Sequence, residues 1–215
     1  MDDSTEPPSA TSRLTLTTCD GVDLAAELIV PPRPASVAVL THPHPLMGGD
    51  MHSPVTASLF RFLPKSQVAV LRFDFRGAGN SSGTFGEGVA EANDVHAAID
   101  AVPTALAEIP LAIVGYSFGA DVALQVVDNR LDGWLLIAPP LRSVAQASMA
   151  ASSDQRPKLL AVPEHDQFNP PEQAASRVAD WVNTGIEVVT RGDHFLAGQM
   201  QVVTGIATRF LAGLG

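Results

Sequence analysis

A serine between two glycines is the residue of this sequence best placed to do chemistry. Ser117 is the centre of Gly-Tyr-Ser-Phe-Gly, residues 115–119, which has the pattern G-x-S-x-G. A strand-like apolar run precedes the pattern at residues 111–114, and apolar residues at helical spacing follow it. Between a strand and a helix, this pattern predicts a sharp turn that lifts the serine hydroxyl clear of a sheet, because the glycines let strand and helix pack closely. Ser117 is therefore our candidate nucleophile.

A serine hydroxyl needs a general base, and a carboxylate must orient that base. Asp166 lies in the loop after a predicted buried strand, where open α/β sheets gather functional groups. Of the six histidines, only His194 follows the last predicted strand and precedes the last predicted helix. We therefore expect Ser117, His194 and Asp166 to form a catalytic triad. Two rival acids fit less well, since Asp193 adjoins His194 in sequence and Glu164 lies within the end of its strand.

The order Ser, Asp, His along the chain is that of the α/β-hydrolases, and the sequence resembles this superfamily from about residue 14 to its last residue. Within it, the chain resembles small lidless bacterial members described as dienelactone-hydrolase-like or serine-aminopeptidase-like. Besides the serine pentapeptide, the resemblance is carried by T-H-P-H-P-L-M-G-G-D-M at 41–51, F-D-F-R-G-A-G-N-S-S-G at 73–83 and E-H-D-Q-F at 164–168. The resemblance implies acyl transfer to water.

It also implies an oxyanion hole, in which two backbone N–H groups bind the oxygen that gains charge. One N–H belongs to Phe118, at the amino end of the predicted helix, where the helix dipole also favours negative charge. The second is expected from the loop after the first long buried strand. Because Pro43 and Pro45 have no N–H, we expect the backbone of His44 to supply it, with Leu46 as the alternative.

No cofactor or metal is expected. His42, His44 and His52 are close in sequence, but no carboxylate or cysteine completes a recognisable ligand spacing around them. Gly77-x-Gly79 follows a predicted strand, yet the next glycine does not fall where a dinucleotide-binding fingerprint requires it.

Composition disfavours several classes of partner. With 215 residues, 46% of them hydrophobic, the chain can form one domain with a full core, which we expect over residues 13–215. Residues 1–12 are polar, acidic and proline-bearing, and are expected to be a flexible tail rather than a signal peptide. A formal charge of −10 disfavours nucleic acid, and no apolar stretch approaches the ~18 residues of a membrane span. The lone Cys19 cannot form an internal disulfide, and we expect a cytoplasmic monomer or homodimer.

The predicted elements alternate, as in an α/β-hydrolase fold with a mostly parallel eight-stranded sheet and helices on both faces. Strands are predicted at residues 14–18, 22–30, 36–41, 68–73, 111–115, 133–137, 158–162 and 186–190. Helices are predicted at residues 53–64, 89–102, 118–129, 171–183 and 196–212.

The interval between the sixth and seventh predicted strands, residues 138–157, is too short for a lid domain. It has room for one crossover helix, which we expect over the small residues 145–152. We therefore expect an open cleft, lined by residues such as Leu46, Met47, Phe118, Leu141, Phe168 and Phe195. The predicted function is hydrolysis of a small carboxylic ester or thioester. The alternatives are a non-catalytic binding protein of the same fold, and an acyltransferase or peptidase that uses the same triad.

Overall fold

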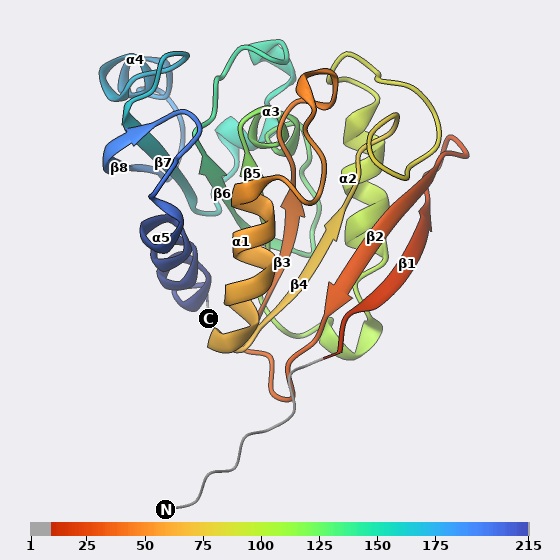
Figure 1. The fold of residues 1–215 in the computed structure, drawn as a ribbon. Coiled ribbons are helices and arrows are strands. Elements are labelled where there is room, and N and C mark those ends of the chain that lie inside the picture. The colour runs from red at the N-terminus through yellow and green to blue at the C-terminus, as the bar shows by residue number, and fades with distance from the viewer. Residues whose placement is uncertain (1–9, 215) are drawn as a thin grey trace, which may run out of the picture.

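The computed structural model describes residues 10–214 and shows eight strands in one sheet, in the order β1-β2-β4-β3-β5-β6-β7-β8 (Figure 1). The strands are β1 (Ser12–Thr17), β2 (Asp23–Ile29), β3 (Ser36–Thr41), β4 (Val68–Phe73), β5 (Leu111–Tyr116), β6 (Leu131–Ile137), β7 (Lys158–His165) and β8 (Thr184–Asp193). The predicted number of strands is confirmed. The expected tail, residues 1–12, falls mostly outside the described residues, and its last residue, Ser12, is the first residue of β1.

Antiparallel pairing is confined to one side of the sheet. β2 pairs antiparallel with β1 and with β4, and all the other neighbouring strands are parallel. Every residue of β3, β4 and β5 is buried, which explains why their sequences are apolar without alternation.

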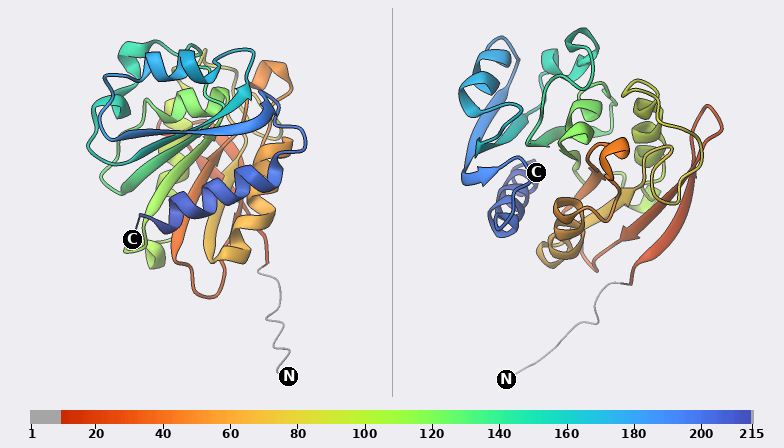
Figure 2. Two further views of the ribbon diagram at one scale, coloured as in Figure 1. Left: turned by 90° about the vertical axis from the view of Figure 1, so that its left-hand side faces the viewer. Right: turned by 45° about the horizontal axis from the view of Figure 1, so that its top comes forward.

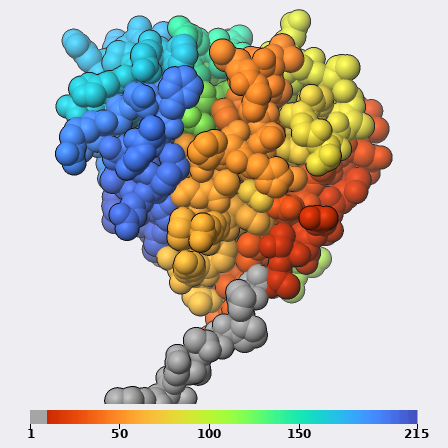
Figure 3. Space-filling model, viewed as in Figure 1, coloured from red at the N-terminus to blue at the C-terminus, as the bar shows by residue number. Residues whose placement is uncertain are grey.

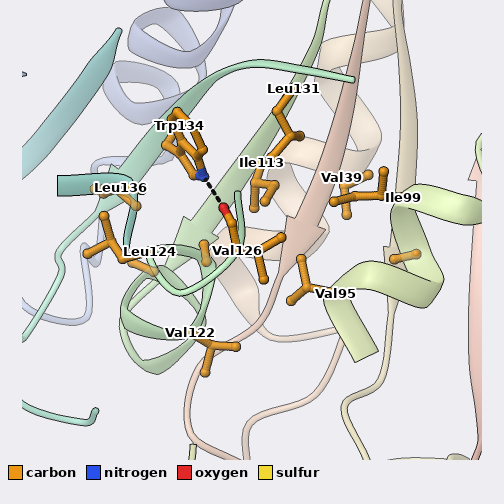
Figure 4. Close-up of a cluster of buried hydrophobic side chains, with 14 of the residues drawn as sticks. Val39, Val95, Ile99, Ile113, Val122, Leu124, Val126, Leu131, Trp134 and Leu136 are labelled. Carbon is orange, nitrogen blue, oxygen red and sulfur yellow. Dashed lines mark hydrogen bonds between the residues drawn. The ribbon is translucent and has the colours of Figure 1, made fainter. Parts of the chain in front are cut away.

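Helices cover both faces of the sheet (Figures 1 and 2). On one face, α1 (Pro54–Phe62) and α5 (Met200–Ala212) pack together over a core cluster that includes Leu59 and Ile206. The opposite face is covered by α2 (Glu91–Asp100), α3 (Phe118–Ala123) and α4 (Pro171–Arg177). In that second cluster the buried indole of Trp134 donates from Nε1 to the carbonyl oxygen of Val126 at 3.2 Å (Figure 4).

All five helices are shorter than predicted, and α3, α4 and α5 differ by four residues or more at one end. In α3 and α5, backbone groups have tertiary partners or left-handed conformations. The α3 helix ends at Ala123 rather than at residue 129, and the carbonyls of Leu124 and Val126 beyond it accept from Ala151 and Trp134. The prediction for the last helix was wrong at its start, because Leu196 and Gly198 have positive φ angles, and α5 begins at Met200. The α4 helix ends at Arg177 instead of residue 183.

The crossover helix predicted over 145–152 is also wrong. The segment between β6 and β7 forms two short 3₁₀ turns instead, Gln146–Ser148 and Ala150–Ser153. Met149 and Ala151 are buried against the core, and the Ala151 N–H donates to Leu124. Burial of these two residues overrides the helix propensity of a short alanine- and serine-rich run. No lid domain lies between the two strands.

The loops that follow β3, β5, β6, β7 and β8 gather at the edge of the sheet that is uppermost in Figure 1. In the space-filling view, the loop after β3 (orange) stands at this rim between the later segments (cyan to blue) and the yellow segment before α2 (Figure 3). No helix in residues 10–214 is long and apolar enough to span a membrane.

Candidate active site

Ser117 lies at the tip of a strained turn between β5 and α3. Its φ is 53° and its ψ is −120°, a conformation that a non-glycine residue rarely adopts. A Cβ at Gly115 would lie 2.5 Å from the Cα of Ala120, so only glycine lets the strand and helix pack this closely. The Ser117 N–H donates to the carbonyl of Ile137 at 2.9 Å, which ties the turn to the end of β6.

A hydrogen-bonded chain runs from this serine to a buried carboxylate. The Oγ of Ser117 lies 2.8 Å from Nε2 of His194, and Nδ1 of the same imidazole lies 2.8 Å from Oδ2 of Asp166. Ser117 retains 8% of its surface exposed, whereas His194 and Asp166 retain 5% and 4%. The structure thus brings together the three residues that the sequence proposed, from three separate loops.

Asp166 is held as a carboxylate by its surroundings. Its Oδ1 accepts hydrogen bonds from the N–H groups of Phe168 and Asn169 at 2.8 and 3.1 Å. Burial raises the pKa of Asp166, but the bonds from His194 and the two backbone N–H groups outweigh it, and the pKa lies below its ordinary value. An acceptor-only carboxylate requires the proton on Nδ1 of His194, which leaves Nε2 free to accept the Ser117 proton.

The two rival carboxylates are engaged elsewhere. Asp193 accepts from the N–H of Phe195 at 3.1 Å, within its own turn. Glu164 accepts from the N–H of Arg191 at 2.7 Å. Neither one is hydrogen-bonded to the His194 ring.

Neighbouring rings fix the His194 side chain. The Phe168 ring meets the imidazole edge to face, with centroids 4.5 Å apart, and the Tyr116 hydroxyl donates to the His194 carbonyl at 3.1 Å. Burial raises the pKa of Tyr116 to about 12, so its hydroxyl remains a neutral donor.

The N–H groups of Phe118 and His44, the two proposed oxyanion donors, make no hydrogen bond to another group within residues 10–214. Both residues line the cleft beside Ser117, and their rings are in contact, with centroids 4.8 Å apart. The alternative donor is occupied, because the N–H of Leu46 donates to Nδ1 of His44 at 3.2 Å. The geometry therefore favours His44 over Leu46.

Sequence reasoning considered His42 only as a metal ligand and missed its position behind the oxyanion loop. The ring is fully buried, and burial lowers the pKa of His42 to about 4, so it is neutral. Its Nε2 accepts from the Phe75 N–H at 2.9 Å, which places the ring proton on Nδ1, 2.6 Å from the Pro43 carbonyl oxygen. That carbonyl belongs to the same peptide group as the His44 N–H. No pattern in the sequence signalled this role, because the Phe75 N–H that fixes the ring comes from a loop thirty-three residues away.

The loop after β6 was also missed as a functional element. Asp121 of α3 accepts from the N–H groups of Leu141, Arg142 and Ser143, at distances of 2.8–2.9 Å. Burial raises the pKa of Asp121, against the effect of these three donors. Leu141 has a φ of 52°, a left-handed conformation that these bonds maintain. An aspartate two residues after the pentapeptide, on an otherwise apolar helix, was the available signal.

These loops enclose a cleft with a volume of about 590 Å³ above Ser117. It is lined by Pro43, His44, Met47, Gly48, Gly49, Ser53, Pro54, Val55, Tyr116, Ser117, Phe118, Pro140, Arg142, Ser143, Phe168, His194 and Phe195. Of the six expected lining residues, Leu46 and Leu141 are absent. Leu46 points to solvent with 71% of its surface exposed, and the left-handed turn at Leu141 directs its side chain into the core.

The cleft is mostly apolar and contains no Asp or Glu side chain among its described lining residues. Arg142 is its one side chain with a permanent charge. No group of three or more His, Cys, Asp or Glu within residues 10–214 could hold a metal ion.

Comparisons with known proteins find one matching family and one curated relative. The profile of the family described as serine aminopeptidase, S33, matches residues 36–188. A segment of 116 residues is 38% identical to an uncharacterized protein of Rickettsia prowazekii (strain Madrid E), and covers 51% of this chain. That segment is 48% of the relative, so the chain spans about half the length of the curated relative it matches.

Two solved structures superpose over nearly the whole chain. One is an alpha-beta serine hydrolase homologue from Coxiella burnetii, with a TM-score of 0.83 and 26% identity over 94% of this chain and 97% of that one. The other is a lidless a/b serine hydrolase from Xanthomonas campestris, with a TM-score of 0.81 and 26% identity over 95% and 96% of the two chains. Both therefore share the fold of this chain, and the Xanthomonas protein is described as having no lid.

Proposed function

This chain belongs to the serine aminopeptidase S33 family of the α/β-hydrolases, and from that premise we propose that it hydrolyses a small carboxylic ester or thioester through an acyl-enzyme. The observation that carries the proposal is the hydrogen-bonded chain Ser117–His194–Asp166 at the base of the apolar cleft. The coarser statement, that the chain is a hydrolase, rests on its family. The absence of a lid rests on the short segment between β6 and β7.

In the proposed reaction, Nε2 of His194 takes the proton of the Ser117 hydroxyl as Oγ bonds to the substrate carbonyl carbon. The carbonyl oxygen becomes an oxyanion, which the N–H groups of Phe118 and His44 stabilise. Collapse of this intermediate expels the alcohol or thiol, which receives the proton from His194 and leaves the acyl group on Ser117. Water then attacks the acyl carbon, with His194 as the base, and frees the serine.

The chemistry of the cleft supports an ester or thioester over the aminopeptidase substrate in the family's description. An aminopeptidase must bind the ammonium group of a peptide N-terminus, and an anionic side chain is the usual partner for a cation. The described lining contains no carboxylate, and Arg142 would repel an ammonium group. Esters also have the better leaving group.

The test is turnover of p-nitrophenyl acetate and butyrate, in parallel with an aminoacyl p-nitroanilide. We expect ester hydrolysis that Ser117→Ala lowers by about 10⁴-fold, since triad members elsewhere have effects of this size. Ser148→Ala is the control, because Ser148 is exposed and its hydroxyl bonds only within its own turn. Ester turnover that survives in folded Ser117→Ala would contradict the proposal. Faster cleavage of the anilide would favour a peptidase. If neither substrate is turned over, a non-catalytic binding protein would be favoured.

A further inference from the structure

The proposed reaction leaves the one permanently charged side chain of the described cleft lining unused, the guanidinium of Arg142. It lines the cleft beside Ser117, and its side-chain nitrogens make no hydrogen bond or ion pair within residues 10–214. Several other arginines among the described residues have acidic partners. Arg76, for example, binds Asp20 and Asp94, and Arg72 binds Glu27. Arg142 is exposed to solvent on the cleft wall, and an arginine there without an acidic partner is free to bind an anion from outside the protein.

We infer that Arg142 selects the substrate by binding a carboxylate, so that the ester preferred by this enzyme carries an anionic group near its scissile bond. The inference rests on the proposed function and names the substrate class of the same site. Arg142 would act on binding and not on the proton transfers, because it does not contact the Ser117–His194–Asp166 chain.

The backbone that carries Arg142 is held in place on both sides. The Arg142 N–H donates to Oδ2 of the fully buried Asp121 at 2.9 Å. On the carbonyl side of the loop, the guanidinium of Arg177 donates to Pro140 at 2.7 Å, and the buried Asn169 side chain donates to Pro139 at 2.8 Å. The Asp121 carboxylate also holds the left-handed backbone at Leu141, the preceding residue, so the loop is preorganised. A preorganised cation loses less freedom when it binds a ligand than one on a mobile loop.

The side chain of Arg142 is directed toward the reacting groups by an aromatic ring. Its guanidinium carbon lies 5.0 Å from the centroid of the Phe168 ring, and that ring is in edge contact with the imidazole of His194. The guanidinium is therefore one ring away from the general base. Stacking leaves the N–H groups in the plane of the guanidinium free for a bidentate carboxylate.

Local charge, and not the net charge of the chain, decides what this cleft attracts. The chain has a formal charge of −10, which disfavours anions at long range, but salt screens such interactions beyond about 8 Å. The described cleft lining offers a cation and no carboxylate. The nearby carboxylates of Asp121 and Asp166 are buried and already hydrogen-bonded, to the backbone at Arg142 and to His194. A substrate carboxylate seated on Arg142 would meet an attractive field.

The competing explanation is that Arg142 only forms part of the cleft wall through its aliphatic stem and does not bind an anion. Experiment can separate the two roles. Two matched substrate pairs place a carboxylate on either side of the ester. On the acyl side, p-nitrophenyl hydrogen glutarate is compared with p-nitrophenyl pentanoate. On the leaving-group side, 4-carboxyphenyl butyrate is compared with 4-carbamoylphenyl butyrate. The ratio of kcat/KM for the anionic and neutral members is measured in each variant, so that differences in intrinsic reactivity cancel.

In Arg142→Met, which keeps the stem and removes the charge, we expect the anionic-to-neutral ratio to fall by about tenfold or more for at least one pair. Arg142→Lys should retain most of the ratio, because lysine keeps the positive charge. Arg33→Met is the control, because Arg33 is exposed, outside the cleft, and has the same charge.

If the anionic-to-neutral ratio in Arg142→Met stays within twofold of the wild-type ratio for both pairs, the inference is overturned. Turnover of the neutral esters in that case would leave the proposed function standing. Loss of neutral and anionic turnover together in that variant would also overturn it, since Arg142 would then serve the fold or the wall. If the wild-type enzyme cleaves no member of either pair, the proposed function fails and the inference with it.

Discussion

The imidazole of His42, which is buried and does not line the cleft, donates from Nδ1 to the carbonyl oxygen of Pro43 at 2.6 Å. The Pro43 carbonyl and the His44 N–H are the two ends of one peptide group. A hydrogen bond to the carbonyl fixes the direction of the N–H and polarises it as a donor. Gly49 packs on the same peptide so closely that a Cβ there would collide with the Pro43 carbonyl. His42 thus acts as a positioning residue, if the His44 N–H binds the oxyanion.

Replacing His42 should therefore lower kcat more than it changes KM. In His42→Ala we expect a loss in kcat of about 10- to 100-fold, somewhat less than the 10²–10³ for complete loss of an oxyanion donor. KM should change by less than about threefold, because the hydrogen bond strengthens in the transition state. Steady-state kinetics with p-nitrophenyl butyrate gives both constants.

His52→Ala is the matched control for that measurement, since His52 is an exposed histidine in the neighbouring turn. Thermal unfolding curves establish that the buried substitution is folded at the assay temperature. An unchanged kcat in folded His42→Ala would contradict the claim that His42 positions the oxyanion loop.

His42 should also make the fold less stable in acid. Burial lowers the pKa of His42 to about 4 from an ordinary 6.5. Below pH 6.5 the unfolded chain therefore binds a proton at this residue, whereas the native protein does not bind it until the pH falls to about 4. Stability is then highest above pH 6.5 and declines as the pH falls. Between pH 7.5 and pH 5 the loss through this one group is about 2 kcal/mol.

Urea unfolding of the wild type and of His42→Gln at these two pH values measures the effect. The glutamine variant lacks the titrating group, so the difference in unfolding free energy between the two proteins should shrink by about 2 kcal/mol at pH 5. Subtracting the variant removes the contributions of the buried carboxylates, which titrate in both proteins. A difference that does not depend on pH would show that His42 is not responsible.

The orienting acid is tested by comparing two neighbouring carboxylates. Asp166→Asn should lower kcat by about 10⁴-fold, because an amide can donate to Nδ1 and so favour the wrong tautomer of His194. Asp193→Asn should stay within a few fold of the wild type, since Asp193 bonds only to its own turn. The assay is single-turnover hydrolysis at pH 8. A larger loss in Asp193→Asn than in Asp166→Asn would reverse the assignment.

The lidless architecture predicts a limit on acyl length. Met47 and Phe195, which line the cleft, have 82% and 64% of their surface exposed, so the walls near the mouth cannot enclose a long chain. Each CH₂ group is worth about 0.8 kcal/mol only when it is buried. A p-nitrophenyl ester series below its aggregation limit should show kcat/KM rising over the first carbons and levelling by about eight. A continued rise would mean that a partner surface covers the cleft.

The sequence was sufficient for the parts of this molecule that depend on local patterns. The strand-turn-helix context located Ser117, and the order of elements placed Asp166 and His194 in loops at the same edge of the sheet. Glycine spacing and apolar runs carry this information directly.

The sequence was insufficient where long-range hydrogen bonds decide the local conformation. Leu141 looked like a cleft residue, but Asp121, twenty positions earlier, holds its backbone in a left-handed turn and its side chain faces the core. The same bonds set the position of Arg142 in the wall. The helix expected over 145–152 was wrong for a similar reason, since Ala151 bonds to Leu124. No pattern within a window of a few residues records such partners.

Covalent labelling of Ser117 tests the central claim most directly. A fluorophosphonate reacts with a serine only where a base activates the hydroxyl and donors bind the developing oxyanion. The wild type and Ser148→Ala should each gain one adduct by intact mass, located on the peptide that contains Ser117, while folded Ser117→Ala should gain none. Labelling of Ser117→Ala at the wild-type rate, or an adduct on another serine, would contradict the proposal that Ser117 is the nucleophile.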